Sequence, residues 1–353
     1  MIEDAWEAVQ EELSRSGKSD GLPLVPPTPE RVERMLKPHG LRPDAVVAQL
    51  MPAYVDATWR DLAENAVMAG CRPEYLPVVG AAIEAVAAGE FNLLGIQTTT
   101  GSATPAVIVN GPVAAAIGMN AAGNALGPGN RANATIGRAV RLVLQNVGGA
   151  IPGVGDMATL GQPGKYTFCF AENAAESPWP ALHVERGFAP DASVVTVAGV
   201  AGNIEIVESS SASAEELIHT YAHSMLIAGT ISMSGYLGGG EPLIIMPPEH
   251  AVFLSQCGYT KEQVKSAIFE AVQYPLARLS PYVRERLIAS RKQANAANVE
   301  GLVRLAALAK DVMIVVAGGV GVKAAYLPTW SGGTRAVSRM VPGKGQSTAD
   351  KRG

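Results

Sequence analysis

The chain has 353 residues and a hydrophobic content of 48%, enough for one large α/β domain or two smaller ones with a packed core. Its net charge is -4 without a run of Lys or Arg, which argues against a nucleic-acid-binding protein, and an aromatic content of 5% argues against a base-stacking surface. Charged residues make up only 17%, so we expect part of the surface to be buried between the subunits of a homo-oligomer.

The start of the chain, Met1-Ile-Glu-Asp4, is acidic, and no apolar segment of a signal peptide follows it. No run of about eighteen apolar residues occurs, so we expect no membrane-spanning segment. The three cysteines cannot all pair with one another inside one chain (Cys71, Cys169 and Cys257). Together these features favour a cytoplasmic protein with free thiols.

The N-terminal part is predicted to be helical apart from one proline-rich arm. Apolar residues at helical spacing indicate a helix at about 4–15. The arm at 20–30 is too rich in proline for a regular element. Its Thr28-Pro29 pair indicates the start of a second helix, with threonine as the N-cap and proline at the first helical position. Two further helices follow, at about 59–70 and 74–88.

Two extended segments and a long helix come next. The stretch Ile96–Thr100 is rich in β-branched residues, as strands are, and the apolar run Pro105–Asn110, bounded by proline and glycine, is typical of a buried strand. A stripe of apolar residues then indicates a helix at about 132–147, which two glycines end.

The second half repeats this plan loosely. A glycine-rich turn at 238–240 precedes an apolar strand at 242–247, and a further strand is expected at 312–316. The helices of this half are expected near 214–228, 249–257, 260–272 and 281–290.

Two pairs of similar segments suggest an internal duplication. TPAVIVNGP (104–112) matches EPLIIMPPE (241–249), and GQPGKYTF (161–168) resembles GGVGVKAA (318–325) with one residue inserted before the lysine. The alternative is coincidence among glycine and apolar residues. We therefore predict an α/β fold of two similar halves with mixed sheets, a helical N-terminal segment, and a pseudo-twofold axis with a cleft between the halves. The expected domains are 1–58 (helices and arm), 59–190 and 191–345 (the two α/β halves), and 346–353 (a flexible tail).

The glycine-rich stretch GPGNRANATIG (127–137) is predicted to bind an anion. Its glycines let backbone N–H groups approach a ligand, and the helix that follows adds unpaired N–H groups and a positive dipole end. Arg131 would offer a planar fork to a carboxylate or phosphate, with Asn130 and Asn133 beside it. The alternative is a helix-capping turn in which Arg131 lies in solvent.

A group of hydroxyls, Thr98, Thr99 and Thr100, lies at the turn between the two extended segments. These side chains either stabilise the turn or line a ligand pocket at the carboxyl end of a strand. With Asn110, which ends the buried strand, they complete the candidate substrate-binding residues.

Candidate catalytic residues gather in a third segment, where Asp156, Lys165, Cys169 and Glu172 fall within seventeen positions. If Lys165 and Cys169 share a strand, their even separation places them on the same side, where the lysine would lower the pKa of the thiol. The alternative, which we favour, is that Cys169 is a small core residue between two phenylalanines.

Cys71 lies at a helix end and just before the next helix, whose dipole would stabilise a thiolate, as would Arg72. A buried helix-end cysteine is the equal alternative. His183, with Glu185 two residues on, is a candidate general acid or base. His219 and His223 lack the glutamate of a HExxH motif, so we predict no metal site, and no cofactor is indicated.

Six blocks of the sequence, taken in order, resemble the bacterial UGSC-type (seleno)protein family, specifically the component associated with the subunit that carries a selenocysteine-Gly-Ser-Cys motif. The resemblance covers most of residues 20–260 and weakly the segment VAGGVGVKAAYLP. It implies a partner with a thiol or selenol redox pair, but this chain has no Gly-Ser-Cys motif of its own. The blocks are DGLPLVPPT, AVMAGCRPEYLPVV, IVNGP, GPGNRANATIGRA, PGVGDMATLGQPGKYTFC and AENAAESPWPALHVERGF.

These features lead to one leading hypothesis and two alternatives. The leading one is a cytoplasmic enzyme or enzyme subunit that binds a small anionic metabolite between its halves and carries out thiol-dependent, oxidoreductase-type chemistry. The first alternative is a non-redox lyase or hydrolase, in which Asp156, Glu172 or His183 handles protons and Arg131 fixes a carboxylate. The second is a non-catalytic binding subunit for the thiol or selenol partner.

Overall fold

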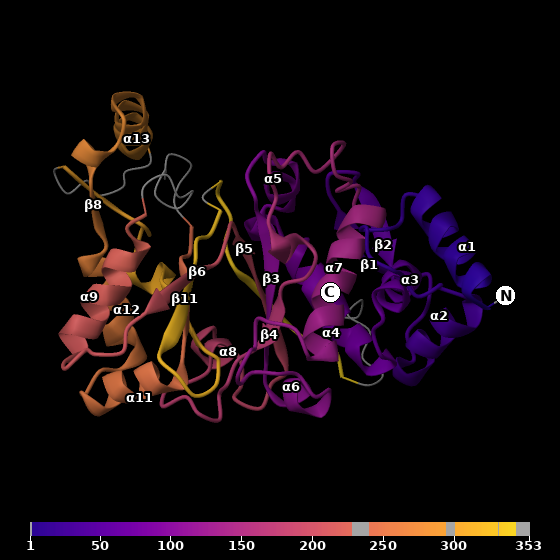
Figure 1. Cartoon of the computed structure of the whole chain (residues 1–353), viewed down its shortest axis with the longest axis horizontal. Coiled ribbons are helices and arrows are strands. Elements are labelled where there is room, and N and C mark those ends of the chain that lie inside the picture. Colours follow the sequence, from indigo (N-terminus) through magenta and orange to yellow (C-terminus); the bar gives the residue numbers. More distant parts are fainter. Residues whose placement is uncertain (1, 228–239, 294–300, 331, 344–353) are drawn as a thin grey trace.

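The computed structural model describes residues 2–227, 240–293, 301–330 and 332–343. Two four-stranded mixed sheets pack face to face, and helices cover the outer face of each, so the body has four layers (Figure 1). This confirms the predicted α/β class with mixed sheets. The expected glycine turn at 238–240 and the expected tail at 346–353 lie largely or wholly outside the described residues.

The first sheet has the strand order β12-β5-β3-β4. Its central strand β3 (Thr104–Asn110) pairs in parallel with β4 (Cys169–Ala171) and antiparallel with β5 (Val194–Val200). The edge strand β12 (Val337–Met340) pairs antiparallel with β5. The sheet therefore combines strands from both sides of residue 190, where we expected the first α/β domain to end. The predicted domain boundary itself remains a prediction.

The second sheet has the order β10-β7-β11-β6 and the same plan. Its strand β7 (Leu243–Met246) pairs in parallel with β10 (Met313–Val316) and antiparallel with β11 (Lys323–Leu327). The edge strand β6 (Ile204–Val207) pairs antiparallel with β11. If the two halves are divided after β6 rather than at residue 190, β6 is the last strand of the first half and β12 is the last strand of the second. Each of these strands lies in the sheet of the other half.

The registers of the two sheets agree residue by residue. Val109 of β3 pairs with Ala171, and Met246 of β7 pairs with Val316, which is the alignment of TPAVIVNGP with EPLIIMPPE. The structure thus supports the first duplicated pair. The second pair was wrong, because 161–168 precedes β4 whereas 318–325 follows β10, the strand equivalent to β4.

The core alternates from one strand residue to the next, as side chains in a pleated sheet must. Ala106 and Ile108 of β3 face Leu243 and Ile245 of β7 in a cluster shared by the two sheets. The intervening residues, such as Val107, face the helices of their own half. Apolar residues on both faces explain why these strands read as continuous apolar runs.

The helices that cover the first sheet come from the first half, and their local sequence explains where they begin. Thr58 and Asp61 form a capping box at the start of α3. A helix that is apolar all round, α4, is buried between α3, α7 and the sheet. The bounds are Trp59–Ala69 for α3, Leu76–Val86 for α4 and Arg131–Asn146 for α7.

The second sheet is covered in the same way, and Thr260 and Gln263 cap α12. The helices predicted near 249–257, 260–272 and 281–290 all form. The bounds are Ala214–Met225 for α9, Pro248–Gln256 for α11, Lys261–Ala271 for α12 and Pro281–Gln293 for α13. Among the described residues no single helix is long and apolar enough to cross a membrane, although Pro73–Val86 and Gly89–Thr98, a bent pair, reach that length and composition together.

The N-terminal segment is helical, as predicted, but it also contains a hairpin that the sequence analysis missed. The helices are α1 (Ile2–Arg15) and α2 (Pro29–Leu36), and the hairpin joins β1 (Val46–Leu50) to β2 (Val55–Thr58). The stretch Ile96–Thr100, expected to be extended, lies at the end of a short helix instead. The remaining short elements are α5 (Leu93–Thr98), α6 (Pro112–Ala116), α8 (Leu182–Glu185), β8 (Gln273–Pro275) and β9 (Leu302–Arg304).

Candidate functional site

A cavity of about 230 Å³ lies between the proline-rich arm, α2, the end of α3 and the start of α7. It contains two residues that the sequence singled out from distant segments, Cys71 and Arg131. Its wall is also rich in arginine. The lining residues are Val25, Arg31, Arg34, Met35, Val67, Gly70, Cys71, Arg72, Pro73 and Arg131. We call it the arginine pocket.

Local structure places each arginine. Arg31 and Arg34 are three positions apart on α2 and therefore share a helix face. Arg72 follows the left-handed Gly70 that ends α3, and Arg131 is the first residue of α7. The Nε and Nη2 atoms of Arg131 donate to the carbonyl oxygen of Gly70 at 3.0 and 2.9 Å, so a helix end holds this guanidinium in place.

Among the described residues, the guanidinium groups of the arginine pocket form no ion pair, although the charge of Glu30 acts on its neighbour Arg31. The only other hydrogen bond from these guanidinium groups runs from Arg31 Nη1 to the carbonyl of Pro26, in the part of the chain that the structure describes. None of the lining residues is acidic, and no described carboxylate lies within 4 Å of any of the four guanidinium groups. Since each guanidinium has five N–H donors, most remain free for a ligand.

The thiol of Cys71 forms part of the wall and is protonated. Its Sγ donates to the carbonyl oxygen of Thr135 at 3.2 Å. Burial raises the pKa of Cys71 to about 12, and Arg131 and Arg138 offset this only in part. The pKa therefore moves in the opposite direction to the one expected from a neighbouring helix dipole, because removal from water outweighs the nearby positive charges.

The glycine-rich bend itself does not line the pocket, contrary to expectation; only Arg131 of that stretch does. Asn130 is the N-cap of α7 and accepts from the N–H of Asn133 at 3.0 Å. Asn133 in turn donates to the carbonyl oxygens of Asn120 and Ala125. These asparagines fix the fold of the loop before α7, which is the capping role of the alternative interpretation.

The threonines do not line the arginine pocket but lie at the end of α5. Thr98 Oγ1 donates to the carbonyl of Leu94 at 2.8 Å, and Thr99 Oγ1 accepts from the N–H of Gly101 at 3.0 Å. Thr100 accepts through its carbonyl from Thr159. They precede β3 and so lie at its amino end, on the side of the sheet where the antiparallel strand β5 ends at Val200. Their bonds are those of turn residues.

Lys165 does not accompany Cys169. It ends a short 3₁₀ helix and forms an ion pair with Asp156 at 2.6 Å, and Arg141 lies 3.5 Å from the same carboxylate. Burial lowers the pKa of Lys165, and Asp156 opposes that shift. The expectation of a lysine and a thiol on one strand face was wrong, because the strand begins only at Cys169.

The other two cysteines have no reactive surroundings. Cys169 is buried beneath α7, and burial strongly raises the pKa of its thiol. The helix packs closely there, since a Cβ added to Gly137 of α7 would lie only 3.1 Å from Cys169 Cβ. This favours the core role that we preferred for it. Cys257 is exposed at the end of α11.

The structure brings together Asn110, Glu172 and His183 at the carboxyl ends of the parallel strands β3 and β4. Asn110 Nδ2 and the N–H of Leu182 both donate to Glu172 Oε2. Burial raises the pKa of Glu172, and Lys261, His183 and these hydrogen bonds oppose the shift. One polar atom of each is buried without a partner in the described residues: Asn110 Oδ1, Glu172 Oε1 and His183 Nδ1.

Sequence reasoning missed several charged residues. Arg31 and Arg34 could have been noticed as a basic pair on one face of the helix that Thr28 starts. Lys261 gave no such signal, because a lysine in the first turn of a helix normally reaches solvent, yet here only 1% of its surface is exposed. It pairs with Glu185 at 3.1 Å, and Lys265 contacts the same carboxylate.

Apart from Cys169, Asn130 and Asn133, the predicted site residues therefore form three separate groups rather than one. Cys71 and Arg131 line the arginine pocket, Asn110, Glu172 and His183 are buried at the strand ends, and the threonines lie with Asp156 and Lys165 at the opposite edge of the sheet. Among the residues that the structure describes, no three His, Cys, Asp or Glu side chains could share a metal ion. The rings of His219 and His223 stack on each other, 3.9 Å between centroids.

Comparisons with models of known protein families, with characterised proteins and with solved structures find no match for this chain.

Proposed function

We propose that the protein binds a small organic anion in the arginine pocket. The observation that carries the proposal is the set of four arginines around one cavity with no acidic lining residue. Arg34, Arg72 and Arg131 are exposed and Arg31 is partly buried, so water solvates these charges in the empty pocket. Four positive charges around one cavity still repel one another, and a bound anion offsets that repulsion and accepts their hydrogen bonds.

The chemistry of the wall indicates the class of ligand. A guanidinium presents two parallel N–H donors that match the two oxygens of a carboxylate or phosphate. A cavity of about 230 Å³ holds a metabolite with one or two such groups, and the apolar side chains of Val25, Met35 and Val67 would contact its carbon skeleton. A mono- or dicarboxylate, or a small phosphate ester, satisfies both features.

Binding is supported more directly than chemistry. Because the Cys71 thiol stays protonated near neutral pH, it is a poor nucleophile in the empty pocket. The thiol-dependent reaction, the lyase or hydrolase alternative, the homo-oligomer and the selenol-bearing partner subunit therefore remain predictions from the sequence. The thiol-dependent reaction and the lyase or hydrolase reaction would both use a carboxylate ligand.

Calorimetric titration with succinate, oxalate and inorganic phosphate tests the proposal. We expect at least one of these anions to bind, and Arg72→Gln or Arg34→Gln to weaken it about tenfold or more, because a hydrogen bond to a charged group contributes roughly 1.5–3 kcal/mol. Arg278→Gln, at an exposed position of the second half, is the matched control and should change nothing. Binding that both pocket variants retain in full would refute the assignment.

Alkylation of cysteine provides a second measurement on the unaltered protein. Because the Cys71 thiol is buried and protonated, it reacts slowly with iodoacetamide, so its modification is followed over hours at alkaline pH. A bound anion should slow that reaction further by covering the thiol. The exposed Cys257 reports on the general reactivity of the reagent in the same sample and should be unaffected. Equal protection of both cysteines would point to a change elsewhere in the protein.

A further inference from the structure

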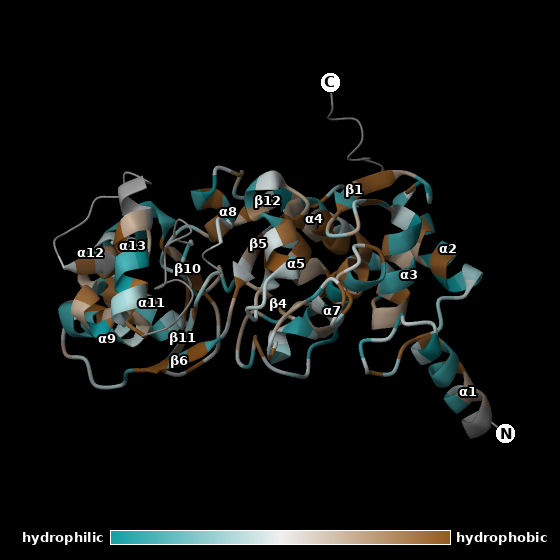
Figure 2. Ribbon diagram, turned by 90° about the horizontal axis from the view of Figure 1, so that it is seen from above, coloured by the Kyte–Doolittle hydropathy of each residue, from teal (hydrophilic) through white to brown (hydrophobic). Residues whose placement is uncertain are grey.

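A buried group of polar side chains joins α5 and α7 to the glycine-rich loop 153–164 that precedes β4. Arg141 of α7 donates through Nη1 to Gln97 Oε1 at 3.0 Å and through Nε to the carbonyl oxygen of Lys165 at 3.1 Å. Figure 2 shows α5, which carries Gln97, beside α7. Asp156 of the loop pairs with both Arg141 and Lys165. We call Gln97, Arg141, Asp156 and Lys165 the Arg141 cluster.

The Arg141 cluster holds more positive than negative charge. Arg141 and Lys165 share one carboxylate, that of Asp156, and among the described residues no other carboxylate lies within 4 Å of either. The exposed fractions of the three side chains are only 9%, 13% and 6%. Two cations and one anion leave one positive charge in excess, largely removed from water, and a buried charge without a counter-ion is costly.

The titration of the two basic groups agrees with this charge balance. Burial lowers the pKa of Arg141 and also that of Lys165, which is the expected direction where a positive charge is costly to hold. Asp156 opposes both shifts. Lys165 donates to both oxygens of Asp156 at 2.6 Å, and this ion pair favours its charged form.

Gln97 adds a hydrogen-bond donor that has no partner. Only 1% of its surface is exposed, and within the described residues its Nε2 atom is buried without an acceptor. Because a guanidinium only donates, the amide must turn its oxygen toward Arg141 Nη1 and its NH₂ group elsewhere. Arg141 uses only two of its five N–H groups in hydrogen bonds. Free N–H groups and excess positive charge therefore occur at the same place.

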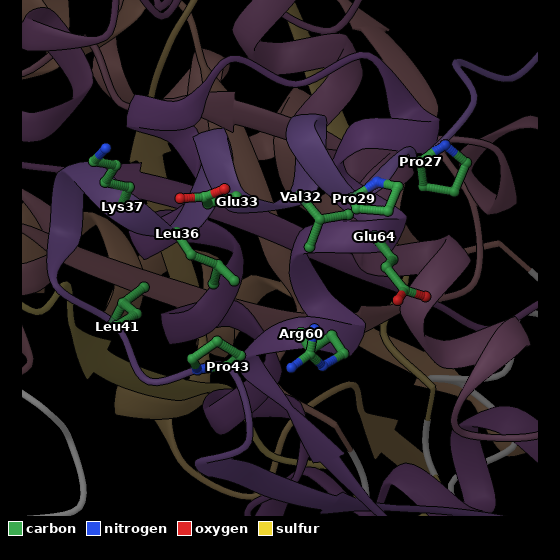
Figure 3. Close-up of a pocket in the computed structure, with 10 residues that line it drawn as sticks. All are labelled: Pro27, Pro29, Val32, Glu33, Leu36, Lys37, Leu41, Pro43, Arg60 and Glu64. Atoms are coloured by element: carbon green, nitrogen blue, oxygen red, sulfur yellow. The ribbon is translucent and has the colours of Figure 1, made fainter.

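Charges balance at two other places in the first half. The buried pair of Arg138 and Asp20, also on α7, has one charge of each sign. A cavity of about 360 Å³ beside α2 has two charges of each sign in its wall, and Figure 3 shows each glutamate on the same side as one basic residue. Neither place needs a counter-ion. The charged residues of that wall are Glu33, Lys37, Arg60 and Glu64.

We propose that the Arg141 cluster binds a small monovalent anion, chloride or a carboxylate of about the size of formate, between Gln97 Nε2 and the guanidinium of Arg141. One negative charge balances the cluster and accepts the N–H groups that no protein atom accepts. A water molecule would accept the same hydrogen bonds but leave the charge uncompensated. The site is independent of the arginine pocket, because none of its residues lines that pocket.

The bound anion would stabilise the folded chain by connecting three distant segments. Gln97 and Arg141 are 44 positions apart, and Arg141 and Lys165 are 24 positions apart. The unfolded chain therefore has no such site, and an anion that binds only the folded state shifts the folding equilibrium toward it. Stability should then depend on the anion in the buffer.

Urea denaturation at constant ionic strength tests the proposal. Sodium gluconate, whose anion is too large for the site, is replaced stepwise by sodium chloride or sodium formate. We expect the denaturation midpoint to rise and then level off as the site saturates. A response to formate alone identifies a carboxylate as the ligand, and a response to chloride identifies a halide. A midpoint that stays constant, or that rises without levelling off as in a general salt effect, would overturn the proposal.

Gln97→Glu supplies the missing charge from the chain itself. One carboxylate oxygen would accept from Arg141, and the other would take the place of Nε2 and repel the anion. At neutral pH we expect a higher midpoint in gluconate than for the wild type, and no further rise in chloride or formate. Gln10→Glu, the matched control, loses a donor to the carbonyl of Leu24 and should lower the midpoint but keep the rise. A Gln97→Glu protein that keeps the full rise would contradict the assignment.

Bromide locates the site in the wild-type protein without any variant. Anomalous diffraction from crystals soaked in sodium bromide should show an ion beside Gln97 Nε2 and Arg141. Arg34→Gln, in the arginine pocket, should leave the rise of the midpoint intact. Bromide found only in the arginine pocket, or a rise that Arg34→Gln abolishes, would overturn this inference and leave the proposed function of that pocket standing.

Discussion

The two halves of the molecule share their framework but not the side chains at the ends of their strands. In the first half, β3 ends with Asn110, and Glu172 follows β4. At the equivalent places of the second half stand Pro247 and Ala317, in the same register. The comparison shows that the apolar side chains on both faces of the strands determine the framework. Residues just beyond the end of a strand can change without disturbing it.

The difference extends to the surroundings. Glu172 lies near Lys261, a buried lysine on α12 of the second half. Its equivalent, Ala317, is uncharged and needs no such partner. The polar cluster thus joins the two halves at one edge only. Variants can be chosen in pairs, one in each half, to show where the halves are equivalent and where they differ.

The largest effect is expected for paired truncations between the two sheets. Ile108→Ala and Ile245→Ala remove equivalent side chains from the shared core. Each should lower the free energy of unfolding by about 2–4 kcal/mol, because a buried isoleucine is replaced by a cavity. Urea denaturation measures both. Losses that differ by more than about 2 kcal/mol would break the equivalence of the two halves, given the usual spread of such values.

The next effect concerns the polar cluster itself. Glu172→Ala introduces the residue that the second half has at this place and leaves the donors of Asn110 and Leu182 unpaired. We expect a loss of about 1–3 kcal/mol, as for other buried groups that lose a partner. Glu205→Ala, at an exposed site on β6, is the matched control and should change stability by less than about 0.5 kcal/mol.

The pH dependence of stability should also report on Glu172. Its pKa is raised in the folded protein, so the folded state binds this proton more tightly than the unfolded chain does. The stabilisation that results is complete below the ordinary pKa of 4.5 and is lost as the pH rises through the raised value.

Glu172→Gln removes that titration. The free energy of unfolding of the wild type, measured relative to this variant in urea at a series of pH values, should therefore fall as the pH rises above about 4.5. A difference that stays constant with pH, or that grows, would show that burial does not dominate at Glu172.

The smallest effect is expected at the exchanged edge strand. Thr196 of β5 and Ser338 of β12 share a buried hydrogen bond of 2.8 Å, whereas Ala325 and Glu205 occupy the equivalent positions. Thr196→Val keeps the shape and should cost about 1 kcal/mol. Thr98→Val, which loses only a local bond at the surface, should cost less than about 0.5 kcal/mol in the same denaturation experiment.

Much of the framework was predictable from sequence. The match between 104–112 and 241–249 identified the two central strands, because a strand buried on both faces must be apolar throughout. The stretch at 96–100 was predicted to be extended, but most of it belongs to or follows a short helix. Asn92 accepts from the N–H of Gly95 and starts that helix, which outweighs the β preference of isoleucine and threonine. The exchange of edge strands was not predictable, since nothing in β6 or β12 alone identifies a partner in the other half.

The candidate site was predictable only in pieces. Cys71 and Arg131 were each noticed beside a helix end, and the link between them is the carbonyl of Gly70, to which Arg131 donates across sixty residues of chain. Such a contact depends on how α3 and α7 pack. The pKa of Cys71 was predicted with the wrong sign for a similar reason, because a sequence shows neighbouring charges but not the depth of burial.

The exchange of strands has a consequence for synthesis on the ribosome. The edge of β5 stays open until β12 emerges, and 136 residues separate Val200 from Val337. At about 5–20 residues per second this delay lasts roughly 7–27 s. During that time a nascent chain presents an unpaired apolar strand edge that invites pairing with its neighbours. Escape from aggregation in the cell therefore depends on what shields β5 until the last strand arrives.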